Sequence, residues 1–125
     1  MADAKEKTIS LLSAVTVSFA ADGQTALYTV PTGKRCVITH AIIVAAADAG
    51  TTTLSIGQVG ALTDFLAVNT LGNLDAQYDA VVLQPIPNTT PLKGKSYAAS
   101  TVIQADVGAN AGAAGNTVYL FGFLY

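Results

Sequence analysis

The chain has 125 residues and a mass of 12.7 kDa, which fits one domain of ordinary size. Hydrophobic residues make up 51% of it and charged residues 11%, less than half of the usual charged fraction of about 25%. This composition excludes an intrinsically disordered chain, and six Lys and Arg against eight Asp and Glu argue against nucleic-acid binding through a dense basic face.

Membrane insertion and disulfide chemistry also find no support in the sequence. The longest apolar run spans residues 41–47, whereas a membrane-spanning helix needs about 20 apolar residues. No segment has the pattern of a secretory signal peptide, and a lone cysteine, Cys36, excludes an intrachain disulfide. We therefore expect a soluble protein made in a cytoplasm. A small domain with so few charges usually hides surface against neighbours, which indicates an assembly subunit.

The first segment, residues 1–10, is expected to form an extended polar arm. Charged residues are concentrated in it: Asp3, Lys5, Glu6 and Lys7 lie within the first seven positions. Ten residues span at most about 33–36 Å, which is enough to reach a neighbouring subunit. The candidate contacts of this arm are Asp3, Lys5, Lys7 and Ile9.

The remainder, residues 11–125, is expected to form a single all-β domain of about eight strands. Turn signals recur about every 8–12 residues, which is typical of an antiparallel β-sandwich or barrel. The strands are expected at 14–19, 25–30, 35–45, 51–57, 80–84, 97–107 and 117–125. Residues 61–68 are compatible with a strand or with a short helix, because short apolar runs are ambiguous. Asp22-Gly23 predicts a hairpin or a corner between strands.

Two of these strands, 36–45 and 117–125, are apolar on both faces. A sandwich strand with one face in water alternates apolar and polar residues, so we expect both faces to be covered. One cover is the facing sheet, and the other is a loop or another subunit. Aromatic surfaces are enriched in interface cores, so we expect the odd-numbered face of the last strand to pack between protomers. Its residues are Tyr119, Phe121, Phe123 and Tyr125.

Catalytic and metal-binding patterns are nearly absent. His40 is the single histidine, and on a regular strand it shares a face with Cys36 at about 13 Å, too far for a thiolate–imidazolium pair. Neither Asp22, Asp48 nor residues 75–79 match a calcium loop. The segment 108–115 lacks the Lys and Ser/Thr of a phosphate-binding loop and is expected to be a hairpin loop. We therefore expect no catalytic residue, no cofactor and no metal.

Two smaller features remain open. The basic positions Lys34-Arg35 and Lys93–Lys95 are interpreted as solvated turn residues, although they suit an acidic partner. Sugar-binding sandwiches use exposed aromatic side chains, and this chain has no Trp. The available aromatic residues for such a site are Tyr28, Tyr78 and Tyr97.

Several stretches resemble small structural proteins of tailed bacteriophages. Residues 25–44 carry a Tyr-x-Val-Pro-x-Gly-Lys turn before a long strand that ends in paired aliphatic residues. Residues 115–125 carry an aromatic–Gly–aromatic–Leu ending, and residues 81–85 and 105–107 are also similar. Together these stretches cover about half of the chain and are spread over most of its length.

The resemblance implies a jelly-roll-like antiparallel β-sandwich in the virion, made in the host cytoplasm. The role it implies is a head decoration (cementing) protein, often a homotrimer, whose arm touches the major capsid protein or a sister subunit. Another virion position, in the tail, baseplate or a head fibre, is an alternative. A carbohydrate-binding sandwich that attaches to host glycans is a second alternative. Partners among nucleic acids and membranes are not expected.

Overall fold

The computed structural model describes residues 8–85, 95–109 and 112–125. These residues form nine strands and no helix. The strands are β1 (Ser10–Val17), β2 (Gly23–Thr29), β3 (Cys36–Val44), β4 (Thr53–Gln58), β5 (Ala61–Thr70), β6 (Ala80–Leu83), β7 (Lys95–Tyr97), β8 (Val102–Gly108) and β9 (Asn116–Leu124). Among the described residues, no helix has the length and hydrophobicity needed to span a membrane.

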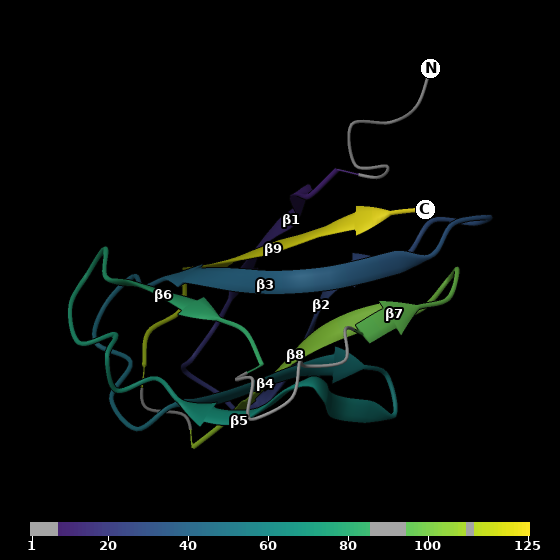
Figure 1. The fold of residues 1–125 in the computed structure, drawn as a ribbon. Helices are drawn as coiled ribbons and strands as arrows, with labels where there is room; N and C mark the ends of the chain where they lie inside the picture. Colours follow the sequence, from purple (N-terminus) through teal and green to yellow (C-terminus); the bar gives the residue numbers. More distant parts are fainter. Residues whose placement is uncertain (1–7, 86–94, 110–111) are drawn as a thin grey trace, which may run out of the picture.

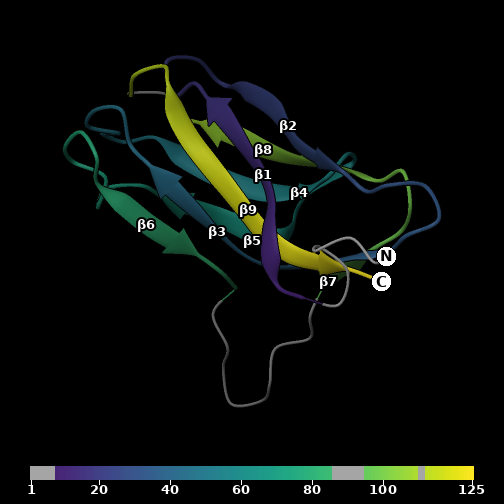
Figure 2. The same ribbon diagram turned by 90° about the horizontal axis from the view of Figure 1, so that it is seen from above.

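The strands form two antiparallel sheets stacked face to face (Figure 1). The first sheet has the order β1-β9-β3-β6. The short strand β7 pairs with the same edge of β3 as β6 does, but with the first residues of β3 instead of the last. The second sheet has the order β2-β8-β4-β5. Figure 2 shows the first sheet lying over the second. The prediction of an all-β protein built as an antiparallel sandwich is therefore confirmed in this coarse form.

The hydrophobic core lies between the two sheets and follows from the alternation of side chains along each strand. In β9, every even-numbered residue is buried and every odd-numbered residue is only half-buried. In β8, Ile103, Ala105 and Val107 are buried in the same alternating manner. The largest fully buried side chains are Tyr97, Phe19, Ile43, Leu54, Ile56, Leu71, Leu74, Ile103 and Leu120.

Two sequence predictions about elements are wrong, and one open alternative is decided. Residues 61–68, for which the sequence allows a strand or a short helix, are strand, because Gly60 at φ 86° closes a turn that lets β5 pair with β4. The expected strand 97–107 is two strands, because a turn with Ser100 at φ 67° moves the chain from β7 in the first sheet to β8 in the second. The segment 108–115 is not a hairpin loop, because β8 and β9 belong to different sheets.

The N-terminal arm was expected to extend to residue 10, but Ser10 already belongs to β1 and pairs with Gly122 of β9. At Asp22-Gly23 the chain forms a corner rather than a hairpin, because it passes from β1 in the first sheet to β2 in the second.

A β-bulge in β3 changes which face its residues occupy. The register with β9 shifts between Ile38 and His40, so Cys36 points into the core whereas His40 lies beside Phe121 on the opposite face. The prediction that Cys36 and His40 share one face is therefore wrong. A regular period of two cannot anticipate the extra residue that a bulge inserts.

Candidate functional site

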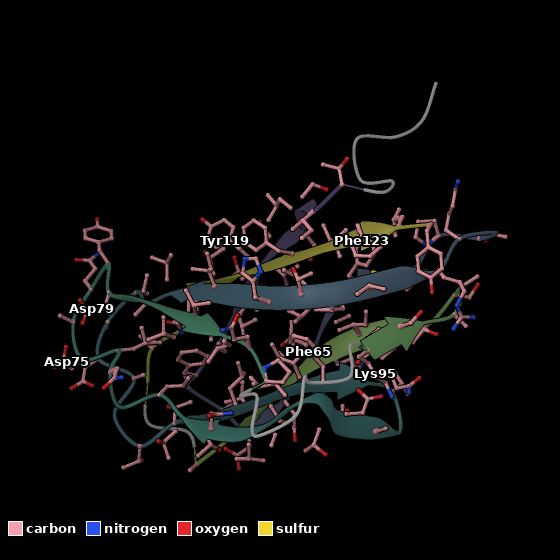
Figure 3. All side chains as sticks on the ribbon, in the orientation of Figure 1. Phe65, Asp75, Asp79, Lys95, Tyr119 and Phe123 are labelled. Atoms are coloured by element: carbon pink, nitrogen blue, oxygen red, sulfur yellow. The ribbon has the colours of Figure 1, made fainter. Side chains whose placement is uncertain are left out.

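The face of the first sheet that points away from the second sheet, here called the outer face, is apolar. The strands β1, β3, β6 and β9 contain no Asp, Glu, Lys or Arg. In Figure 3, Tyr119 and Phe123 point away from the second sheet, whereas Phe65 points into the space between the sheets. An uncharged sheet face of this kind is unusual on a surface that meets water.

Strand pairing assembles the outer face into rows that cross the sheet. Tyr119 lies between Ile42 and Ala14, and Val82 of β6 extends that row beyond Ile42. The next row places Phe121 between His40 and Leu11. The row after it places Phe123 beside Val37. The outer face thus contains an aromatic strand flanked by aliphatic side chains on both sides.

Its centre holds a stacked pair of rings. The His40 and Phe121 ring centroids lie 4.6 Å apart, and the two ring planes differ by 4°. Thr39 Oγ1 lies 3.0 Å from His40 Nδ1 and donates a hydrogen bond to the carbonyl oxygen of Phe121 at 3.2 Å. These contacts fix the imidazole against the sheet, so it widens the aromatic surface instead of standing out into solvent.

The sequence identified the aromatic part of this face and missed the rest. Tyr119, Phe121 and Phe123 are half-buried and Tyr125 is 48% exposed, and all four share the outer face. Leu11 at 43% exposure and Val82 at 61% exposure belong to the same face but come from β1 and β6. Only the pairing of β1 and β6 around β9 and β3 brings them there, and a single strand's pattern does not contain that information.

Tyr125 lies at one end of the outer face. Arg35 and Tyr125 exchange two backbone hydrogen bonds, and the Tyr125 hydroxyl lies 2.7 Å from Ser96 Oγ. Hydrogen bonding to Ser96, with a further contribution from Arg35, lowers the pKa of Tyr125. Arg35 therefore stands at the margin of the apolar face, and no charged side chain of the described residues lies within the four strands.

The corresponding face of the second sheet carries polar and charged side chains among its residues. Gln104 and Asp106 alternate with the buried residues of β8, and Gln24 of β2 lies opposite Asp106. The two sides of the sandwich therefore differ: one is suited to water and the other to contact with a second apolar surface.

A polar cluster joins the two sheets near one end of the molecule. Asp64 of β5 accepts hydrogen bonds from the Tyr97 hydroxyl at 2.8 Å and from Gln58 Nε2 at 2.7 Å, and Lys95 Nζ lies 3.2 Å from it. Burial alone would raise the pKa of Asp64, but the bonds from Tyr97, Gln58 and Lys95 outweigh it and lower that pKa. The Asp64 carboxylate is bonded to Tyr97, Gln58 and Lys95. The cluster therefore connects the two sheets and offers no unpaired catalytic base.

The other candidates for chemistry lie apart from one another. Burial raises the pKa of the Cys36 thiol to about 11, so the thiolate that would react is scarce at neutral pH. Among the described residues, no group of three or more His, Cys, Asp or Glu is arranged to hold a metal ion. A groove of about 400 Å³ runs along β5 to the end of β6, but its lining has no acid, base or thiol. Its residues are Thr63, Phe65, Leu66, Ala67, Val68, Asn69, Gln84 and Pro85.

The three tyrosines considered for sugar binding do not form one exposed aromatic surface. Tyr97 is buried in the core, Tyr28 is half-buried on β2, and Tyr78 is 78% exposed in the segment before β6. Of the arm residues, Ile9 is exposed next to β1. The candidates Asp3, Lys5 and Lys7, and Lys93 of the second basic pair, lie outside the described residues.

Comparison with protein-family models, with curated proteins and with solved structures gave no significant match.

Proposed function

We propose that the protein is a non-enzymatic structural subunit of a phage particle, a decoration protein that binds the outer surface of the capsid. The single observation that carries this proposal is the outer face of the first sheet. Four strands without one charged residue present aromatic and aliphatic side chains that gain free energy when another protein covers them. The sequence resemblance to small structural proteins of tailed phages supports placing that contact on a virion.

Decoration suits this chain because it needs contact surface and no active site. Many copies on a symmetric shell multiply a modest contact into firm attachment. The partners in this proposal are the major capsid protein and other copies of this chain. The arm, with Asp3, Lys5, Lys7 and Ile9, supplies a second attachment in this proposal. The homotrimer that the resemblance implies stays a prediction.

We also propose that the sandwich is a jelly roll. The order β1-β9-β3-β6 facing β2-β8-β4-β5 supports this, because two four-stranded sheets with crossing connections characterise that architecture. In this interpretation β7 is an added strand that pairs with the first part of β3.

The proposal is tested by co-sedimentation with capsids of the encoding phage assembled without this protein. The full chain is expected to bind at high copy number, and a chain lacking residues 1–7 is expected to bind more weakly while keeping its fold. Equal binding of the two chains would refute the role of the arm. Binding at low copy number, confined to tail or baseplate fractions, would replace decoration by a tail role.

A further inference from the structure

The charged side chains of the described residues are sorted by sign along the strands. One end of the sandwich is formed by the β1–β2, β3–β4, β5–β6 and β8–β9 connections, which hydrogen-bond to one another. Its charged residues are Asp22, Asp48, Asp75 and Asp79, and Asp106 lies two residues from the end of β8. We call this the acidic end.

The acidic end contains no cation among the residues that the structure describes. The backbone N–H groups of Asp75 and Ala76 donate to Asp79 Oδ2 at 3.2 and 3.0 Å. Hydrogen bonding with Asp79 and repulsion from it raise the pKa of Asp75, and Asp48 adds to the repulsion. Among the described residues, the charged side chains of this end are therefore all carboxylates.

The opposite end, here called the basic end, holds all three described cations. Lys34 and Arg35 lie in the connection between β2 and β3, and Lys95 lies opposite Ile38, near the start of β3. Asp64 pairs with Lys95, so the described side chains of this end carry three positive charges and one negative charge. Figure 3 shows Asp75 and Asp79 at one end of the sandwich and Lys95 toward the other. The uncharged outer face extends between these two ends.

We propose that a second copy of this chain covers the outer face in antiparallel orientation, so that the acidic end of each copy lies against the basic end of the other. This rests on the premise of the proposed function that the outer face is a contact surface, and it predicts a dimer in solution where the resemblance implies a homotrimer. The apolar strands supply the affinity, and the charges at the ends determine the orientation.

The separation of the two ends makes the orientation selective. A strand of nine residues is about 30 Å long, several times the Debye length of about 8 Å at physiological ionic strength. Each end therefore interacts with whatever lies directly against it and hardly with the far end. A parallel pair would place the acidic ends together, whereas an antiparallel pair brings opposite charges together twice.

The size of the face fits a weak but specific pair. The strands β1, β9, β3 and β6 have 8, 9, 9 and 4 residues. At about 3.3 Å per residue and about 4.8 Å between strands, they present roughly 480 Å² per copy, or roughly 950 Å² over both copies. Specific interfaces begin near about 1,200 Å² in total, so we expect a dissociation constant in the micromolar range. In a two-fold arrangement the central His40–Phe121 stack of one copy lies near that of the other, where interface anchors are usually found.

Cross-linking tests the orientation. Thr32 lies in the connection at the basic end and Gln77 in the connection at the acidic end, and both are exposed. Native Cys36 is buried, with a pKa of about 11, and does not interfere. We expect a short bismaleimide to link Thr32→Cys chains to Gln77→Cys chains in a mixture, and to link neither variant efficiently to itself. Efficient linkage of Thr32→Cys to itself would overturn the antiparallel arrangement.

Sedimentation equilibrium of the full chain tests the surface. We expect a reversible dimer whose dissociation constant rises at least tenfold in Val82→Lys, because Val82 lies on the outer face at 61% exposure. Val68→Lys is the matched control: Val68 is also 61% exposed but belongs to β5 of the second sheet, and its dimer is expected to be unchanged. A monomer at all concentrations, a trimer, or equal effects of the two variants would each overturn the proposal.

The outcome is separable from that of the proposed function. A chain that forms the antiparallel dimer but does not sediment with capsids refutes decoration and leaves this pairing supported. A chain that binds capsids but stays monomeric or trimeric in solution refutes this pairing and leaves decoration supported.

Discussion

The Tyr97 hydroxyl donates a hydrogen bond to Asp64 Oδ1 at 2.8 Å, and this bond connects the first sheet to the second. Tyr97 is one of the largest fully buried side chains, so its hydroxyl depends on this acceptor inside the protein. The sequence offers Tyr97 as an exposed aromatic residue for sugar binding. It is a core residue in the structure because Asp64 accepts the hydrogen bond of its hydroxyl.

Replacement of Tyr97 by Phe is expected to lower the free energy of unfolding by about 1.5–3 kcal/mol, the usual contribution of a hydrogen bond to a charged group. The ring volume is retained, so the core packing stays intact. Chemical denaturation measures the change. The control is Tyr119→Phe, which removes a hydroxyl from the outer face, away from Asp64, and is expected to alter stability by less than about 0.5 kcal/mol. Equal losses in the two variants would contradict this role for Tyr97.

Asp64 is expected to make folding stability depend on pH in the acid range. Its folded-state pKa is lowered, so the unfolded chain binds the proton more readily and stability rises with pH. The contribution is fully present above about pH 4, the pKa of an unperturbed Asp, and is lost as the pH falls through the lower folded-state value.

The measurement is the free energy of unfolding between pH 6 and pH 2 in the natural chain and in Asp64→Asn. The difference between the two is expected to shrink toward zero at the acid limit. Asp106→Asn, which removes a carboxylate from the polar face of the second sheet, serves as the control. A difference between the natural chain and Asp64→Asn that is independent of pH would show that the cluster does not stabilise the ionised carboxylate.

Gly122 is expected to be intolerant of any side chain. A Cβ at this position would overlap the carbonyl oxygen of Val37 and crowd Leu12 Cδ1, because both neighbouring strands carry a register shift beside it. Gly122→Ala is expected to destabilise the fold by about 1–3 kcal/mol, as measured by thermal or chemical unfolding. Gly72→Ala is the control, because a Cβ there meets no atom within 4 Å. A stable Gly122→Ala variant would contradict the tight passage of β9 between β1 and β3.

The strands predicted best from the sequence are those with apolar residues on both faces. The third and last strands were expected at 35–45 and 117–125 and are observed at Cys36–Val44 and Asn116–Leu124. A long run of β-branched and aromatic residues has few alternatives to a central strand. The break between β7 and β8 was missed because its turn uses Ser100 at a positive φ, where the sequence offers no glycine to indicate it.

The candidate site was predictable only in part for a similar reason. The aromatic residues of β9 share a face by simple alternation, so the sequence reveals them. The contributions of Leu11, Ile42 and Val82 depend on strand order, and the position of His40 depends on a bulge. The sorting of charge into two ends is likewise a property of the topology. Asp48 and Asp79 are distant in sequence, and backbone hydrogen bonds of Ala45 to Tyr78 and Asp79 bring their connections together.

Cys36 is expected to report on folding. Its thiol is buried with a raised pKa of about 11, so a thiol-specific reagent is expected to leave the native protein unmodified near pH 8. Unfolding in denaturant exposes the thiol and is expected to allow rapid modification. The rate of reaction, followed by absorbance or mass spectrometry, measures the exposure. Fast modification of the native protein would contradict the assignment of Cys36 to the core.

A charge at Phe123 of the outer face is expected to abolish self-association before it affects the fold. Phe123 is half-buried on β9 beside Val37, and water reaches it in the isolated chain. An aspartate there is solvated in the monomer but becomes an unpaired buried charge in the assembly, at a cost of several kcal/mol. Phe123→Asp is preferable to Phe121→Asp as the test, because His40 stacks on Phe121 and would partner a carboxylate introduced there.

Sedimentation equilibrium and thermal unfolding of the same samples separate the two effects. Phe123→Asp is expected to weaken association by more than about 100-fold, the equivalent of about 2.7 kcal/mol, with a smaller effect on the unfolding of the monomer. Gln104→Asp places the same charge on the half-buried, polar face of the second sheet and is expected to leave association unchanged. If Phe123→Asp stayed associated with an unaltered melting temperature, the outer face would not be the contact surface, and the apolar composition of β1, β3, β6 and β9 would need another cause.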